Sequence, residues 1–386
     1  MKITIICDVL GEENNGTSVA AMNLIRYLKI NNHEVKVVCA DKFRENEEGF
    51  YIVDEMNFGK QLNKIVKRVG VTIAKANKEI ILDAIKDAEI VHIMLPFSLG
   101  MTTVKLAKEL DIPVTAGFHM MAQNLSSYLK LDNSQFTNKM IYKYIYNHFY
   151  QYVDAIHYPT NFIKSVFERN INKETNGYVI SNGVNESIMK YNERKPINLK
   201  NKFIILNIGR YSKEKAQNIL IKAIYHSKYK DKIQLIFAGH GLKENNYIKL
   251  SNKLPIKPIF KLYSRNEILN VINYSDMYIH TANIELEGIA CLEAITCGKL
   301  TLVSDSKNSA TKDFAVDNKC IFKHNNYKDL AKKIDYFIEN TNERKKYEDL
   351  YLEKSSLYSQ KECMGNMVKM FETIIKVKTS RPKTGC

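Results

Sequence analysis

An apolar run at Met277–Ile279 is followed by a short acidic turn and by a helical pattern that starts near Gly288. This order predicts a buried parallel strand that ends in a loop and opens a helix, and open α/β sheets bind ligands at such strand ends. Two carboxylates, Glu285 and Glu293, stand in this stretch with seven residues between them. The stretch therefore indicates a ligand-binding loop. The alternative is a solvated acidic loop before an ordinary amphipathic helix.

The same strand–turn–helix unit recurs along the 386 residues, too many for one typical domain. A polar segment rich in Asn, Lys and Arg, from Glu186 to Lys202, separates two groups of such units. We therefore predict an α/β fold in which two Rossmann-like domains face each other across a cleft. The predicted boundaries are residues 1–186 for the first domain, 187–201 for a linker, 202–365 for the second domain and 366–386 for a C-terminal helix and basic tail.

Composition narrows the class of protein. Seven cysteines at irregular spacing predict neither a disulfide framework nor a CxxC metal site. No apolar run reaches the roughly 18–20 residues needed to cross a bilayer, and the chain starts directly with a predicted strand, so we expect a cytoplasmic protein. The net charge of +15 indicates a polyanionic partner: nucleic acid, an anionic membrane surface or phosphorylated substrates. We expect no nucleic acid, because no helix-turn-helix, zinc-finger or RNP-like motif is present.

Residues 57–78 carry six Lys/Arg and no acidic residue. Apolar residues recur there at helical spacing, which predicts a helix with an apolar stripe beside a basic face. One hypothesis is that Lys64, Lys67 and Arg68 face an anionic membrane. The alternative is a surface helix whose stripe packs on the sheet, with Gly70 weakening the helix itself.

Charged side chains follow the predicted strand ends. Arg210 and Lys215 come after the strand that ends at Gly209, and their guanidinium fork and ammonium point charge suit a diphosphate. Glu285 and Glu293 suit ribose and sugar hydroxyls, which carboxylates accept as bidentate partners. No Asp-x-Asp signature stands in a fitting loop, so we expect no metal and no cofactor, with protein cations in place of a metal ion.

Two further candidates lie in the first half. His119 follows the predicted strand 111–118, where a histidine is either structural or functional. Gly16 ends the first loop, before a helix for which Thr17 or Ser18 is the predicted N-cap.

Together these residues resemble a known family. The chain is similar to family-4 retaining glycosyltransferases of the glycosyltransferase-B fold, and within them to bacterial α-glucosyltransferases that act on membrane lipids such as sterols or diacylglycerol. The resemblance covers nearly the whole chain. It is carried by Asn15-Gly-Thr-Ser18, Leu95-Pro-Phe97, Gly117-Phe-His119, Ile180-Ser-Asn-Gly183, Gly209-Arg-Tyr-Ser-Lys-Glu-Lys215, and Glu285 with Glu293 in Ile289-Ala-Cys-Leu-Glu-Ala294.

The resemblance implies a reaction and its participants. A hexose, glucose from UDP-glucose, would pass to a lipid acceptor as an α-glycoside, by front-face attack with a donor phosphate oxygen taking the acceptor proton. The first domain would bind the acceptor and the second the UDP-sugar, in an enzyme held at the inner face of the cell membrane.

The resemblance also implies residue roles. Arg210 and Lys215 would hold the diphosphate, Glu285 the transferred sugar and Glu293 the ribose. His119 would lie beside the reacting centre. The remaining donor-binding positions would be Gly16, Gly209, Gly288, Ile289 and Ala290.

Departures and alternatives remain. Ala216 stands where many members have glycine, and the first loop has one glycine where many have two. Three other functions stay open: the same chemistry on a polysaccharide or undecaprenyl-linked acceptor, a sugar-nucleotide epimerase of the same fold, and a basic, non-catalytic binding protein.

Overall fold

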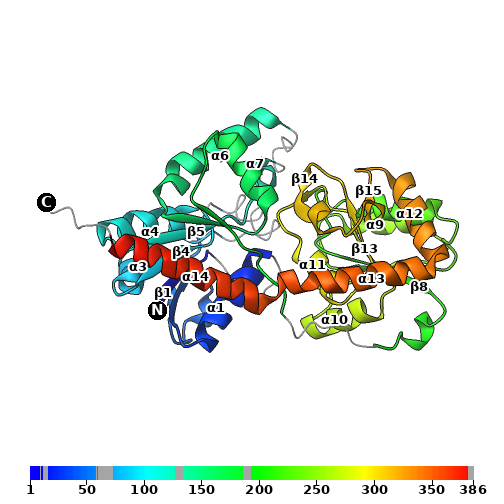
Figure 1. Cartoon of the computed structure of the whole chain (residues 1–386), viewed down its shortest axis with the longest axis horizontal. Helices are drawn as coiled ribbons and strands as arrows, with labels where there is room; N and C mark the ends of the chain where they lie inside the picture. The colour runs from blue at the N-terminus through cyan, green and yellow to red at the C-terminus, as the bar shows by residue number, and fades with distance from the viewer. Residues whose placement is uncertain are drawn as a thin grey trace. The chain divides into compact units, whose positions relative to one another are not determined.

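The computed structural model describes residues 1–8, 10–11, 16–57, 59, 73–126, 134–185 and 193–380. The chain divides into two compact units, coloured blue to green with red, and green to orange, in Figure 1. Unit 1 comprises Met1–Asn182 with Lys361–Cys386, and unit 2 comprises Gly183–Gln360.

Unit 1 is built on a parallel sheet. In its described part seven strands follow the order β3-β2-β1-β4-β5-β6-β7. The strands are β1 Lys2–Ile6, β2 Glu34–Cys39, β3 Phe50–Ile52, β4 Ile90–Ile93, β5 Val114–Gly117, β6 Ala155–Tyr158 and β7 Gly177–Val179. The α-helices are α1 Gly16–Ile30, α3 Lys78–Ile85, α4 Ser98–Glu109, α5 Ala122–Ser126, α6 Gln135–His148, α7 Asn161–Ile171 and α14 Gln360–Thr379.

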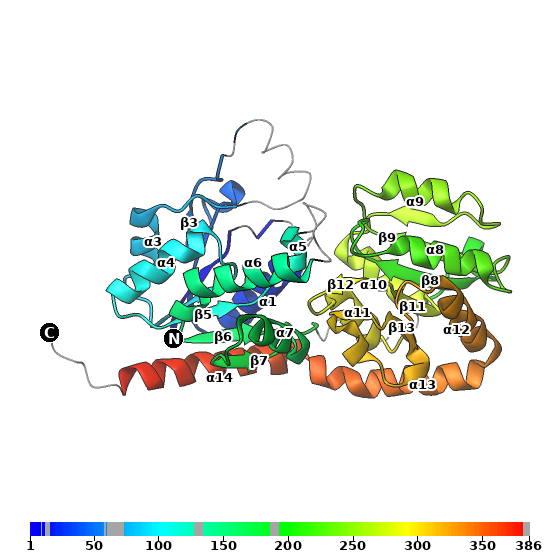
Figure 2. The same cartoon turned by 90° about the horizontal axis from the view of Figure 1, so that it is seen from above.

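The last helix, α14, belongs to the core of unit 1. Met364, Met367 and Phe371 are buried in one cluster with Leu24 and Leu28 of α1, and Figure 2 shows α14 running along this unit. The apolar residues of α14 recur at helical spacing, so one face of the helix packs while its Lys and Glu residues stay outside.

Unit 2 repeats the plan. Its described strands form a parallel sheet in the order β10-β9-β8-β11-β13-β15, with a separate pair β12-β14. The strands are β8 Phe203–Ile208, β9 Ile233–Ala238, β10 Ile259–Lys261, β11 Met277–His280, β12 Ile284–Glu285, β13 Thr301–Ser304, β14 Asn308–Ser309 and β15 Ile321–Phe322. The α-helices are α8 Gln217–His226, α9 Glu244–Ser251, α10 Arg265–Tyr274, α11 Ile289–Thr296, α12 Tyr327–Glu339 and α13 Thr341–Ser355.

The central strands of unit 2 are buried along their whole length. Every residue of β9, β11 and β13 is buried, as expected for parallel strands covered by helices on both faces. This is why apolar residues predominate in β9 and β11. Two parallel α/β units confirm the predicted fold class.

The boundaries between units differ from those drawn from sequence. The first unit ends at Asn182, and the segment from Lys361 onward groups with unit 1. Within the predicted linker, Ile197–Leu199 forms a 3-10 helix whose Leu199 is buried in the core of unit 2. The N-cap prediction for the first helix was wrong, because α1 already includes Gly16, Thr17 and Ser18.

Candidate functional site

Strand order brings the predicted donor residues of unit 2 to one place. Strand β8 lies between β9 and β11, so the chain winds outward from β8 in one direction and then crosses to β11 in the other. Such a reversal of strand order leaves a crevice at the carboxyl ends of the two strands, where α/β proteins bind ligands. Gly209 and Arg210 follow β8, and β11 ends at His280.

The loop after β8 is held against the loop after β9. The Gly209 N–H donates to the Ala238 carbonyl at 3.0 Å, and the Tyr211 N–H donates to the His240 carbonyl at 2.9 Å. A Cβ added to Gly239 would lie 2.3 Å from the Gly209 carbonyl oxygen, so this close approach requires glycine. The backbone that carries Arg210 is therefore fixed, while the Arg210 side chain is 48% exposed and pairs with Glu214 at 3.1 Å.

Lys215 and Glu285 form an ion pair across the β8 and β11 loops. The loops are tied by their backbones as well: Thr281 Oγ1 donates to the Lys215 carbonyl, and the Asn283 N–H donates to the Glu214 carbonyl, both at 2.7 Å. Two segments about seventy residues apart in sequence thus meet.

A buried histidine also contacts the carboxylate of this ion pair. His280 Nε2 lies 3.0 Å from Glu285 Oε2, the oxygen that also receives Lys215. Burial alone would raise the pKa of Glu285, but the charge of Lys215 and the hydrogen bond from His280 lower it to about 2. The carboxylate therefore carries no proton, so His280 Nε2–H is the donor. His280 Nδ1 then accepts from the Tyr278 hydroxyl at 3.0 Å.

Helix α11 begins at a glycine that no other residue replaces without strain. Gly288 is the N-cap of α11, with φ of 85°. A Cβ there would lie 2.8 Å from Thr311 Cγ2 and 3.2 Å from Glu285 Cγ. Ile289 and Ala290, both half-buried, form the first turn. The N–H groups of a first turn have no partner within their helix and attract anions.

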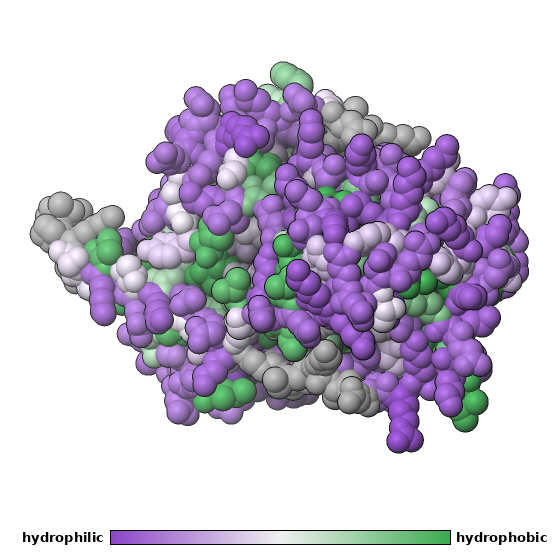
Figure 3. Space-filling view, turned by 45° about the vertical axis from the view of Figure 1, so that its right-hand side comes forward, coloured by the Kyte–Doolittle hydropathy of each residue, from purple (hydrophilic) through white to green (hydrophobic). Residues whose placement is uncertain are grey.

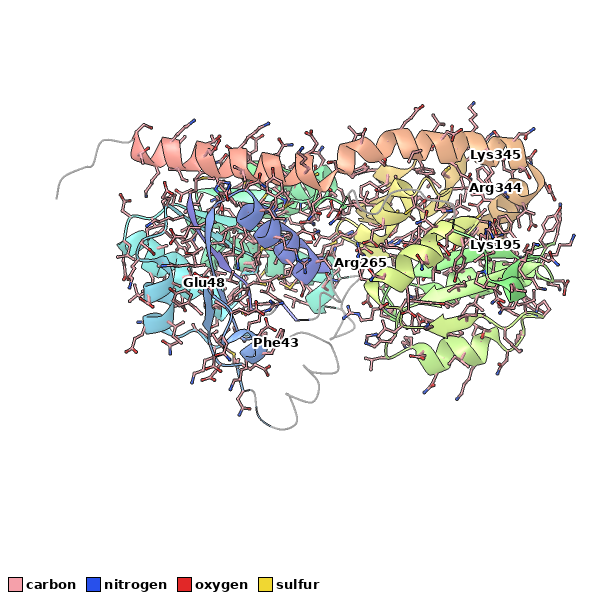
Figure 4. All side chains as sticks on the ribbon, turned by 90° about the horizontal axis from the view of Figure 1, so that it is seen from below. Phe43, Glu48, Lys195, Arg265, Arg344 and Lys345 are labelled. Atoms are coloured by element: carbon pink, nitrogen blue, oxygen red, sulfur yellow. The ribbon has the colours of Figure 1, made fainter. Side chains whose placement is uncertain are left out.

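The second carboxylate has a different partner. Glu293, on α11, accepts from Arg265 Nη1 at 2.5 Å, and its side chain is 6% exposed. Arg265 stands at the start of α10, where Figure 4 labels it, and is about half exposed. Burial raises the pKa of Glu293, and the guanidinium opposes that rise. The pKa values of Glu285 and Glu293 are thus shifted in opposite directions.

The two candidates of the first half lie in unit 1. The His119 ring folds back over Gly117, where an added Cβ would lie 2.3 Å from His119 Nε2. Its centroid is 5.6 Å from that of His157. Burial lowers the pKa of His119 to about 3, so the imidazole is neutral near pH 7. Gly16 is the first residue of α1.

The structure brings some predicted residues together and leaves others apart. Lys215 contacts Glu285, and Gly209 and Gly288 pack beside them; Arg210 pairs with Glu214 and Glu293 with Arg265. The proposed membrane residues Lys64, Lys67 and Arg68 lie outside the described residues.

Three side chains of the site were missed from sequence. His280 closes β11, one residue beyond the predicted strand, and its position five residues before Glu285 was the available signal. Tyr278 was read only as an apolar strand residue. Arg265 is the first residue of α10, and nothing in the nearby sequence links it to Glu293.

The arrangement suits a phosphorylated sugar. It offers three cationic side chains, two ionisable carboxylates and a helix start. Over the ranges that the structure describes, no group of three or more His, Cys, Asp or Glu residues is placed to hold a metal ion. In the same ranges, no helix has the length and apolar character to cross a membrane.

Two solved structures and one curated relative illustrate the similarity. The chain is 25% identical over 224 residues to alpha-monoglucosyldiacylglycerol synthase from Streptococcus pneumoniae, a match that covers 54% of this chain and 50% of that protein. The chain spans about half the length of the curated relatives it matches. HepE from Anabaena, in complex with UDP and glucose, is 16% identical with a TM-score of 0.74, over 97% of this chain and 100% of that one.

The catalytic domain of cholesterol-alpha-glucosyltransferase from Helicobacter pylori is 42% identical with a TM-score of 0.40, over 41% of this chain and 99% of that one. The superposition with HepE covers both units and supports the glycosyltransferase-B fold.

Two family models match consecutive parts of the chain. The model described as Glycosyltransferase Family 4 matches residues 14–188, and the model described as Glycosyl transferases group 1 matches residues 189–350. With the fold and the site of unit 2, these matches show that the chain belongs to the family-4 glycosyltransferases of the glycosyltransferase-B fold.

Proposed function

We propose that this glycosyltransferase moves a hexose, glucose from UDP-glucose, onto a membrane lipid such as diacylglycerol or a sterol, with retention of configuration to give an α-glycoside. The observation that carries the proposal is the chain of contacts among Lys215, Glu285 and His280 at the strand-order reversal of unit 2.

Glu285 is prepared to accept sugar hydroxyls. Its Oε2 is occupied by Lys215 and His280. Within the described ranges, the structure gives Oε1 no hydrogen-bond partner, and the side chain is 13% exposed. An ionised carboxylate with one committed and one uncommitted oxygen has a fixed orientation and can still accept from a ligand.

Cationic side chains neutralise the diphosphate in this proposal, without a metal ion. Lys215 and Arg210 lie on one loop, and Arg210 is half exposed. The first turn of α11 adds backbone N–H donors. As the bond between sugar and phosphate breaks, negative charge grows on the leaving UDP, and fixed cations stabilise that charge more than they stabilise the bound donor.

The lipid acceptor rests on different support. The Streptococcus pneumoniae relative is named for glucosyl transfer to diacylglycerol, and the chain carries a net charge of +15, which suits an anionic membrane. We propose that the enzyme works at the inner face of the cell membrane without crossing it.

One experiment tests donor, acceptor and stereochemistry together. The protein is incubated with several radiolabelled nucleotide sugars and total membrane lipid, and the extract is separated by chromatography. We expect a labelled glycolipid with UDP-glucose, an α-linkage by NMR coupling constants, and unchanged yield with EDTA. Label appearing only in polysaccharide or undecaprenyl-linked material would reject the lipid acceptor, and free UDP and sugar without any acceptor would favour an epimerase.

A further inference from the structure

Helix α6 exposes a row of large apolar side chains. Phe136 is 76% exposed, Met140 54% and Tyr144 56%. They are spaced four residues apart, so with 3.6 residues per turn they lie along one side of the helix. Scattered apolar side chains on a surface need no explanation, but an ordered row does.

The core of unit 1 does not account for this row. The opposite side of α6 already packs inward: Tyr142 and Ile145 are buried, and the Tyr142 ring lies 5.8 Å from that of Phe167. A helix that is apolar on two sides is usually enclosed. Here, among the described residues, nothing encloses Phe136 or Met140.

The outer side of α6 is also positively charged. Lys139 and Lys143 are exposed and alternate with the apolar row, and the sequence from Ser134 to Val153 contains no acidic residue. A helix with apolar and aromatic residues beside lysines is suited to the headgroup region of an anionic bilayer.

Neighbouring residues extend the same chemistry. Lys173 lies over the Tyr146 ring at 5.1 Å, and Lys108 over the Tyr152 ring at 4.7 Å. Tyr152 is itself 44% exposed. Tyrosine is favoured at membrane interfaces because its ring is apolar and its hydroxyl remains hydrated. Figure 3 shows a face of the molecule on which hydrophilic residues predominate, with scattered hydrophobic groups among them.

We propose that the outer side of α6, from Phe136 to Tyr144, is the surface by which unit 1 binds an anionic lipid bilayer. This rests on the proposed function only in its choice of a lipid acceptor, and it assigns the contact to a specific helix. The side chains Phe136, Met140 and Tyr144 enter the interface, while Lys139 and Lys143 bind lipid phosphates.

The absence of tryptophan from the chain permits a direct test. Phe136→Trp places one fluorophore on α6, and Ile197→Trp, at a position that is 94% exposed in unit 2, is the matched control. On addition of phosphatidylglycerol vesicles we expect a blue shift and quenching by brominated lipid for Phe136→Trp only, with no change on phosphatidylcholine vesicles. An unshifted Phe136→Trp, or equal shifts in both variants, would overturn the proposal.

Vesicle flotation measures how much Lys139 and Lys143 contribute to membrane binding. Lys139→Gln with Lys143→Gln is expected to weaken partitioning about 30-fold, the factor that corresponds to ~1 kcal/mol for each lysine. Lys345→Gln with Lys346→Gln, exposed residues of α13, is the charge-matched control and should partition as wild type; Figure 4 labels Lys345. Equal effects of the two double variants would show that vesicle binding depends on net charge and not on α6, and would overturn the proposal.

Variants of the apolar side chains distinguish membrane binding from binding to a protein partner. The triple variant Phe136→Ser, Met140→Ser, Tyr144→Ser is expected to lose flotation by at least ~100-fold, since three apolar side chains no longer leave water. Size-exclusion chromatography follows in parallel: a wild-type dimer that the triple variant abolishes, with flotation retained, would assign α6 to self-association instead.

Failure of the lipid-acceptor proposal can be distinguished from failure of the α6 proposal. Transfer to a short-chain, water-soluble acceptor requires no binding to a bilayer and should be equal in wild type and triple variant. Flotation alone then reports on α6, even if no glycolipid is ever formed.

Discussion

His280 and Lys215 bind the same oxygen of Glu285. His280 Nε2 is 3.0 Å from Oε2, and the Lys215 ammonium pairs with that atom as well. The histidine is 2% exposed and has its other nitrogen bound by Tyr278. A carboxylate held from two sides keeps one orientation, and its other oxygen points to a defined place.

Replacing His280 should therefore impair catalysis without unfolding the chain. His280→Phe removes the N–H donor, and a hydrogen bond to a charged group contributes about 1.5–3 kcal/mol. We expect kcat to fall roughly 10–100-fold. His280→Gln keeps an N–H donor and should recover much of the loss. Steady-state kinetics at saturating donor measure the effect. Equal activities of the Phe variant and wild type would remove His280 from the site.

Glu285→Gln tests the carboxylate itself. The amide keeps the shape but removes the charge that balances Lys215 and that accepts sugar hydroxyls. We expect turnover to fall by about 10²–10³-fold, the loss found when one preorganised polar contact to a transition state is removed, with an unchanged circular dichroism spectrum. Glu339→Gln, a surface ion-pair partner of Lys228, is the control and should keep full activity. Wild-type transfer by Glu285→Gln would refute the site assignment.

Arg265→Met should make donor binding depend on pH. The guanidinium opposes the rise that burial causes in the pKa of Glu293. Without it the pKa of Glu293 rises further, so a larger fraction of Glu293 is protonated at a given pH and the ribose loses an acceptor. We expect the donor KM of Arg265→Met to increase as the pH is lowered, more steeply than in wild type. Parallel KM profiles in the two proteins would argue against this coupling.

Acid should destabilise the fold through histidines in unit 1. Burial lowers the pKa of His92, and lowers those of His119 and His157 to about 3 and about 4. In the unfolded chain they titrate near 6.5, so the unfolded chain binds protons first, and stability present above that pH is lost as pH falls. Each such histidine lowers the free energy of unfolding by about 1.4 kcal/mol per pH unit below 6.5.

Asp8 acts in the opposite sense, because burial raises its pKa to about 7. Three histidines outweigh one carboxyl. The urea concentration at the midpoint of unfolding should therefore decrease as the pH is lowered from 6.5 to 5. His92→Asn should flatten this dependence, and His226→Asn, at an exposed position, should leave it unchanged. A midpoint that rises over this interval would contradict the prediction.

Much of the fold was predictable because its strands are parallel and buried. Met277–Ile279 is a continuous apolar run, and it lies in β11, a central strand of unit 2. Turn glycines marked the strand ends. The membership of α14 in unit 1 was not predictable, since its apolar face is hidden among Lys and Glu residues and its partner, α1, lies more than three hundred positions earlier.

The site was predictable where a role is local. Glu285 and Gly288 lie on one loop, and Lys215 follows a strand end, so spacing indicated them. The partner of each charge was not predictable: Arg265 reaches Glu293 from another helix, and Lys215 is paired with Glu285. Those contacts depend on the packing of α10 and on the strand order β8-β11, which no short window of sequence contains.

Two glycines should respond in opposite ways to the same substitution. Gly288 has φ of 85°, and a Cβ would lie 2.8 Å from Thr311 Cγ2, so Gly288→Ala should destabilise by about 1–3 kcal/mol and displace the start of α11. Gly365 lies within α14, and a Cβ there would lie 3.4 Å from the Tyr27 hydroxyl. Gly365→Ala should stabilise by up to ~1 kcal/mol, since alanine favours the helix.

Thermal unfolding compares the two variants, and donor KM separates stability from binding. Gly288→Ala should raise the donor KM as well as lower Tm, because the first N–H groups of α11 move away from the donor phosphates. Gly365→Ala should leave KM unchanged while Tm rises. If Gly288→Ala lowered Tm but kept the wild-type KM, the glycine would serve only the packing of α11 against Thr311, and the start of that helix would have no part in holding the donor.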